Sequence, residues 1–75
     1  MTYFVIEHDK RPDGVVNVSE TARSTFAGAV SYYHDRYSKM VLNTQFTSVS
    51  LMLVDEDLNV IEQATIETQF SPIEG

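Results

Sequence analysis

Residues 24–43, Ser-Thr-Phe-Ala-Gly-Ala-Val-Ser-Tyr-Tyr-His-Asp-Arg-Tyr-Ser-Lys-Met-Val-Leu-Asn, decide the fold of this chain. Their apolar members recur at the spacing of one face of a helix: Phe26, Ala29/Val30, Tyr33, Tyr37 and Met40/Val41. Ser24 is the expected N-cap, with Ser19 or Thr21 as earlier alternatives. Asn43 is the expected end. The stretch therefore predicts one amphipathic helix in the middle of the chain.

Strand-like sequence lies on both sides of this helix. Residues 2–8 and 15–21 are rich in β-branched and aromatic side chains, and Pro12-Asp13-Gly14 between them is typical of a turn. After the helix, Val49, Leu51 and Leu53 alternate with Ser48, Ser50, Met52 and Val54. Residues 55–59 then form an acidic turn, and residues 60–67 supply a partner strand. The expected order is hairpin, helix, hairpin.

This order predicts a single α+β domain over residues 1–75, a ββαββ fold in which one helix covers one face of a four-stranded sheet. Residues 70–75 are expected to fray. Two strand orders satisfy short connections. In the order 2-1-4-3 the first and last strands lie parallel at the centre, which is β-grasp-like, whereas in 2-1-3-4 all neighbours are antiparallel. We favour the first order. Element order alone carries no function.

Alternation along the strands divides their side chains between the two faces of the sheet. The helix-covered face is expected to hold Phe4, Ile6, Val16, Val18, Val49, Leu51, Leu53, Ala64 and Ile66. The opposite face would then carry Tyr3, Val5, Val15, Met52, Val54 and Ile61 among polar residues. Strands favour such side chains even when they are exposed. The alternative is that these residues form a surface for a second copy or another protein, and the unprotected 15–18 edge offers a strand-edge dimer as a third possibility.

The helix supplies a second candidate interaction surface. Tyr32 and Arg36 are four residues apart, so the guanidinium is expected to stack on the ring, away from the apolar stripe that holds Tyr33 and Tyr37. Tyr and Arg are frequent at the energetic centres of protein interfaces.

The charge of the chain is distributed unevenly. The net charge is -6, and all of it arises in residues 43–75, which contain no Lys or Arg. The candidate acidic surface there consists of Asp55, Glu56, Asp57, Glu62 and Glu67. Such a surface argues against direct binding to nucleic acid or to an anionic membrane, and it permits a second hypothesis, an acidic inhibitor or nucleic-acid mimic of phage or mobile-element type that binds a basic protein.

No residue pattern predicts catalysis, a metal or a cofactor. The chain has no Cys, and Asp55-x-Asp57-x-Asn59 lacks the Gly and Glu of a calcium loop, since Val60 and Ile66 stand at those positions. Nothing in the sequence requires His8 and His34 to meet. We therefore expect a small non-enzymatic interaction module that is cytoplasmic and homodimeric. A ligand-binding protein or enzyme with a site completed at a dimer interface is the remaining alternative.

Overall fold

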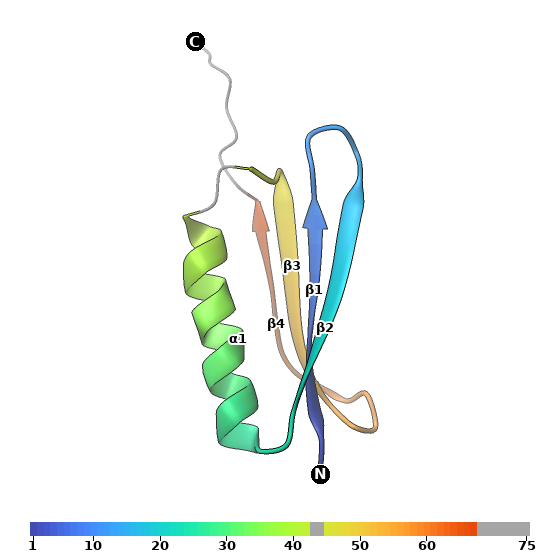
Figure 1. Ribbon diagram of the computed structural model, residues 1–75, viewed down its shortest axis with the longest axis vertical. Helices are drawn as coiled ribbons and strands as arrows, with labels where there is room; N and C mark the ends of the chain where they lie inside the picture. The colour runs from blue at the N-terminus through green and yellow to red at the C-terminus, as the bar shows by residue number, and fades with distance from the viewer. Residues whose placement is uncertain (43–44, 68–75) are drawn as a thin grey trace.

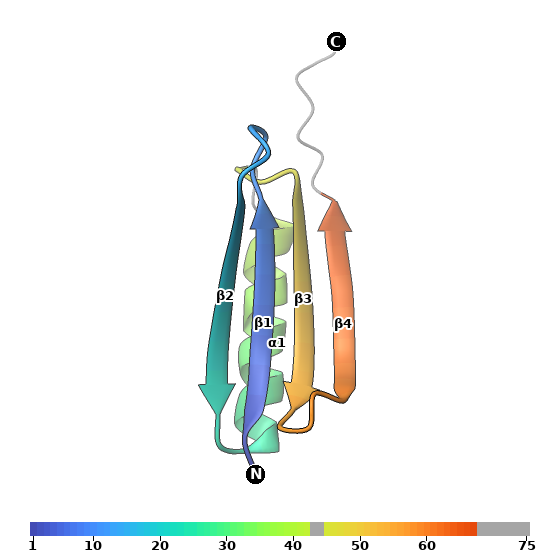
Figure 2. The same cartoon turned by 90° about the vertical axis from the view of Figure 1, so that its right-hand side faces the viewer.

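The computed structural model describes residues 1–42 and 45–67. It contains β1 (Tyr3–Lys10), β2 (Val16–Arg23), α1 (Phe26–Val41), β3 (Ser48–Asp55) and β4 (Val60–Glu67). The strands form one antiparallel sheet, and α1 lies along one of its faces (Figures 1 and 2). The predicted α+β fold with ββαββ order is confirmed. The helix end expected at Asn43 lies outside the described residues. So does the tail, residues 70–75, that was expected to fray.

The strand order is β2-β1-β3-β4, the second of the two orders that the sequence allows. The preference for 2-1-4-3 was wrong. The link after α1 returns the chain to the end of β1, where the Thr47 amide donates to the Lys10 carbonyl at 2.8 Å. From there β3 runs back along β1 with Lys10 opposite Ser48 and Tyr3 opposite Asp55. The two central strands are therefore antiparallel.

Local signals set the turn and the helix start. At the first turn, the Gly14 amide donates to the Arg11 carbonyl, and Gly14 has φ +93°, which a residue without Cβ adopts without strain. The helix is capped by Thr25, and not by Ser24, because the Thr25 hydroxyl accepts from the Gly28 amide at 3.0 Å. A Cβ on Gly28 would lie 2.9 Å from that hydroxyl, so Gly28 leaves room for the cap.

The core lies between α1 and the two central strands. Its buried apolar members are Val5, Ala29, Tyr33, Met40, Val49, Leu51 and Leu53, with Tyr3, Val30, Tyr32, Phe46 and Ile66 packed around them. The face assignments of β3 and β4 are therefore confirmed at Val49, Leu51, Leu53 and Ile66. Tyr33 lies in the core as expected, whereas Tyr37 is 39% exposed. Tyr3 contacts the ring of Phe26 edge-on, at 5.6 Å between centroids.

The faces of β1 and β2 are the reverse of those expected. Val5 and Glu7 are buried beneath α1, and the pairing of β1 with β3 sets Val5 opposite Leu53 and Glu7 opposite Leu51. Phe4 and Ile6 consequently lie on the uncovered face, as do Val16 and Val18 of β2. The expectation failed because it treated Glu7 as a solvent residue, whereas a cation from the helix allows this carboxylate to be buried.

Candidate functional site

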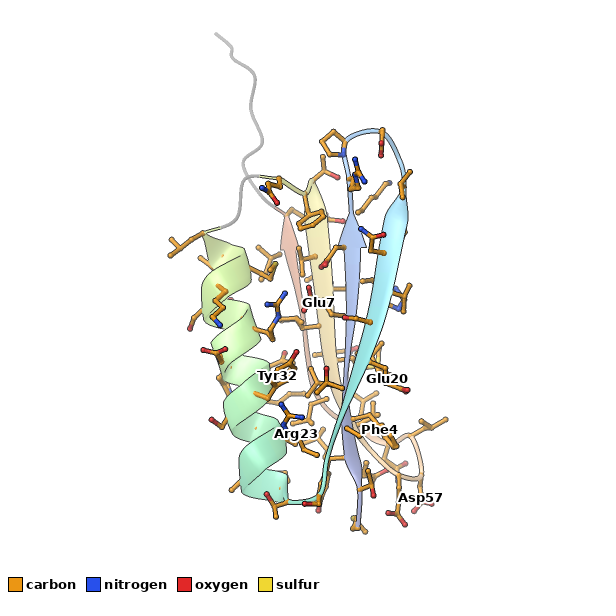
Figure 3. All side chains as sticks on the ribbon, in the orientation of Figure 1. Phe4, Glu7, Glu20, Arg23, Tyr32 and Asp57 are labelled. Atoms are coloured by element: carbon orange, nitrogen blue, oxygen red, sulfur yellow. The ribbon has the colours of Figure 1, made fainter. Side chains whose placement is uncertain are left out.

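The face of the sheet opposite α1 carries an apolar patch at the end that holds the β3–β4 turn. Pairing registers set Ala22, Phe4, Val54 and Val60 side by side across the four strands, with Ile6 and Met52 in the next row. We call these six residues the open-face patch. In Figure 3, Phe4 lies on the side of the sheet away from the helix, whereas Glu7 and Tyr32 lie between helix and sheet.

The patch changes character along the strands. Glu20 and Gln63 flank its second row, and the next row holds Val18, His8, Ser50 and Thr65. The last row holds Val16, Lys10, Ser48 and Glu67. Within the described residues, no element covers this face. An uncovered apolar area with a polar surround is typical of a site for protein contact.

Only some of the residues predicted for the uncovered face of the sheet lie on it. Met52 and Val54 lie on the open face, and Val54 is 2% exposed because its neighbours in the row pack against it. Ile61 is the extra residue where the β3–β4 register shifts, and it is 38% exposed. Tyr3 and Val5 were wrongly placed, since both pack under α1. The expected Val15 lies in the β1–β2 turn, ahead of β2.

A polar cluster lies beneath the helix, on the other face. Arg36 extends from α1 to Glu7 and donates from Nε to Oε1 at 2.8 Å and from Nη2 to Oε2 at 2.9 Å. Burial opposes the charged form of Glu7, but the hydrogen bonds from Arg36 and Asp9 and the charge of Arg36 outweigh it, so the pKa of Glu7 is lowered. The same contact raises the pKa of Arg36. This bidentate pair fixes α1 against β1.

Asp9 adds a second carboxyl group to this cluster. Burial, a hydrogen bond to Glu7 and the charge of Glu7 raise the pKa of Asp9 to about 7. A protonated Asp9 can donate to the Glu7 carboxylate, which explains why two acids share this place. Asp9 Oδ1 is buried and has no hydrogen-bond partner among residues 1–42 and 45–67. Glu7 is only 4% exposed, so this cluster contributes to the packing of α1 against β1.

Arg36 does not stack on Tyr32 as the sequence predicted. Arg36 is engaged by Glu7, and it is Arg23 of β2 that lies over the Tyr32 ring, 4.7 Å from its centroid. The Tyr32 hydroxyl accepts from Thr21 Oγ1 at 3.2 Å. These contacts tie α1 to β2, so the aromatic–cation chemistry recognised in the sequence serves the fold.

The acidic residues of the second half do not gather on one surface. Asp55, Glu56 and Asp57 lie at the β3–β4 turn, where Asp55 accepts from the Asp57 and Asn59 amides at 2.9 Å and Glu56 accepts from the Thr2 amide at 2.7 Å. The hydrogen bonds from Asn59 and Asp57 lower the pKa of Asp55. Glu62 lies on the helix side, 3.2 Å from His34. Glu67 is at the opposite end of β4.

An open pocket of about 480 Å³ lies beside the β1–β2 turn. Arg11, Pro12, Asp13, Asn17, Gln45 and Phe46 line it. Its cation and its carboxylate, Arg11 and Asp13, approach each other to 3.7 Å. Across the described residues, no group of three or more His, Cys, Asp or Glu side chains is arranged to hold a metal ion. Nor is any helix in this part of the chain long and apolar enough to cross a membrane.

Comparisons with protein-family models, with curated proteins and with solved structures found no match to this chain.

Proposed function

We propose that this chain is a small non-enzymatic protein-interaction module that self-associates through the open-face patch. The observation that supports this proposal is the arrangement of β1. This strand turns Glu7 and Asp9 towards the helix and leaves Phe4 and Ile6 on the uncovered face. Burying carboxylates while large apolar side chains such as Phe4 and Ile6 stay only half-buried disfavours an isolated copy. The arrangement is favourable when a second surface covers the patch.

The size of the face limits the strength of this contact. Four strands of eight residues give a face of roughly 500 Å², from strand spacings of about 4.8 Å and rises of about 3.3 Å. Stable interfaces bury about 800 Å² on each partner. Face-to-face contact alone therefore belongs to the weaker class of interfaces, and we expect it to depend on protein concentration.

Light scattering across a concentration series tests the proposal, with Ile6→Lys and Met52→Glu as patch variants. The matched control for Ile6→Lys is Thr65→Lys, which adds the same charge to the same face outside the patch. We expect the wild type to exceed the mass of one 8.5 kDa chain, the two patch variants to lose mass, and the control to behave as wild type. Circular dichroism establishes that each variant is folded. A wild type that is monomeric at high micromolar concentration, or folded patch variants with unchanged mass, would contradict the proposal.

A further inference from the structure

The two edges of the sheet differ in how well they could accept another strand. At one edge, β4 contains the register shift opposite Leu53 and Val54 and carries Glu62 and Glu67. Bulges and charges at an edge hinder further pairing. At the other edge, β2 pairs regularly with β1 along all eight residues, from Tyr3–Arg23 to Lys10–Val16. It carries two charged side chains, Glu20 and Arg23, but has no proline, no lysine and no bulge, and nearly all of its side chains are exposed. The regular pairing of β2 therefore distinguishes the two edges, and charge does not.

The β1–β2 turn shows which groups of β2 point outward. The Arg11 amide donates to the Val15 carbonyl at 2.8 Å, so these residues face each other with their hydrogen-bonding groups. In an antiparallel pair this arrangement alternates. The amides and carbonyls of Asn17, Ser19 and Thr21 are then directed at β1. Those of Val16, Val18, Glu20 and Ala22 are directed at the free edge. The Lys10 carbonyl, which accepts from Thr47 on the side away from β2, fits this alternation.

Only one antiparallel register of a second copy of β2 brings all four outward-facing residues of this edge opposite one another. With Ser19 opposite Ser19 of an antiparallel copy, Val16 meets Ala22 and Val18 meets Glu20, so all outward groups oppose one another. Roughly eight hydrogen bonds result, two for each hydrogen-bonded pair. On the helix side, Asn17 meets Thr21. A register centred on Glu20 would instead set two carboxylates directly opposite each other, which is unfavourable.

We propose that β2 pairs antiparallel with β2 of a second copy about Ser19 and joins the two sheets into one. This inference extends the proposed function but uses a different surface, because the edge contact leaves the open-face patch free. Val16 and Val18, which are 49% and 62% exposed, would continue the patch of the neighbouring copy across the junction. Two such dimers stacked by their open faces make a tetramer with three two-fold axes, a common symmetry of homo-oligomers.

The test removes one backbone N–H that points at the free edge of β2 and leaves the hydrogen bonds between β2 and β1 unchanged. Val18→Pro removes a donor that points at the free edge, and an edge strand tolerates proline at such a position. Val18→Thr is the matched control, since it retains the amide and suits a strand. By light scattering we expect four copies for wild type and for Val18→Thr, and two for Val18→Pro. Two copies are expected for Ile6→Lys, and one when Val18→Pro is combined with it.

These variants separate the two interfaces. A folded Val18→Pro variant with the wild-type mass overturns the edge pairing, whereas unchanged mass in the patch variants contradicts only the proposed function. Hydrogen exchange on the wild type gives a second measurement that needs no variant. Edge pairing protects the amides of Val18, Glu20 and Ala22 at high protein concentration and less so on dilution. If these amides exchange freely while those of Ser19 and Thr21 stay protected, the edge is unpaired and the inference is wrong.

Discussion

Replacing Arg36 with Met removes the cation that accompanies the buried Glu7 carboxylate. Methionine keeps an unbranched stem and a good helix propensity, so the change isolates the guanidinium. Breaking one partner of a buried pair typically costs about 3–5 kcal/mol. The Arg36 side chain is 25% exposed, and water there partly screens the charge, so we expect about 3 kcal/mol at pH 8. For a domain of this size that corresponds to a fall in Tm of roughly 15 °C.

The loss should depend on pH. Arg36 holds the pKa of Glu7 below its usual 4.5, so in the wild type Glu7 contributes stability that is present above pH 4.5 and is lost as pH falls through the lowered value. Without Arg36, burial raises the pKa of Glu7 against the smaller opposing effect of the Asp9 hydrogen bond, and protonation then favours the folded variant. The difference in unfolding free energy between wild type and Arg36→Met should therefore shrink as pH falls from 8 to 4. Urea unfolding followed by circular dichroism measures it.

Two controls sharpen this experiment. Lys39→Met removes an exposed cation 3.0 Å from Asp35 on the same helix, and it should cost about 0.5 kcal/mol or less. Adding Glu7→Gln to Arg36→Met removes the unpaired buried charge and should recover part of the loss at pH 8. A loss in Arg36→Met as small as that of Lys39→Met, or one that is the same at pH 4 and pH 8, would refute the assignment of Glu7–Arg36 as a buried pair.

Three further changes test other features of the fold by urea unfolding. Because the folded pKa of Asp9, about 7, lies above the ordinary 3.8, its contribution is full below pH 3.8 and is lost as pH rises through 7. Asp9→Asn should remove this slope and stabilise the protein by about 1–2 kcal/mol at pH 8; an unchanged slope would contradict the shift. Thr25→Ala should cost about 1 kcal/mol through loss of the helix cap, and no loss would place the cap elsewhere. Leu58 has φ +66° in the β3–β4 turn, so Leu58→Gly should stabilise by about 0.5–1 kcal/mol, and destabilisation would argue against that conformation.

Local signals in the sequence predicted the elements well. The turn at Pro12-Asp13-Gly14 and the helical stripe through Ala29 and Tyr33 are decided by neighbours a few residues away. The strand order was harder to predict, because 2-1-4-3 and 2-1-3-4 both allow short links and bury the same stripe of the helix. What decides it is the return of the chain beside Lys10, a contact across 37 residues. No local pattern encodes such a contact.

The candidate site was predicted only in part, and a single residue explains most of the error. Alternation allows either set of β1 side chains to lie on the helix side of the sheet, and a one-residue change of phase moves every side chain to the opposite face. A carboxylate in an alternating strand predicts the solvent side, and Glu7 is that carboxylate in β1. Its partner Arg36 lies 29 positions away on the helix, where the sequence suggested an aromatic neighbour instead. The signal for the second phase is a cation on the core-facing side of the helix, Arg36, opposite an acid in a central strand, Glu7.

The phase of β1 also connects the buried ion pair to the proposed assembly. The opposite phase would bring Phe4 and Ile6 under the helix, each worth about 1.5–3 kcal/mol on full burial, and would return Glu7 to water. The same exchange would move Tyr3 and Val5, which now pack under α1, to the open face, so the apolar gain at Phe4 and Ile6 is offset and the return of Glu7 to water is what remains. The chain instead directs a cation from α1 at Glu7 and keeps Phe4 and Ile6 on the uncovered face. Association through the open face would bury these two side chains between copies. On this view the Glu7–Arg36 pair specifies which face of β1 is available for association.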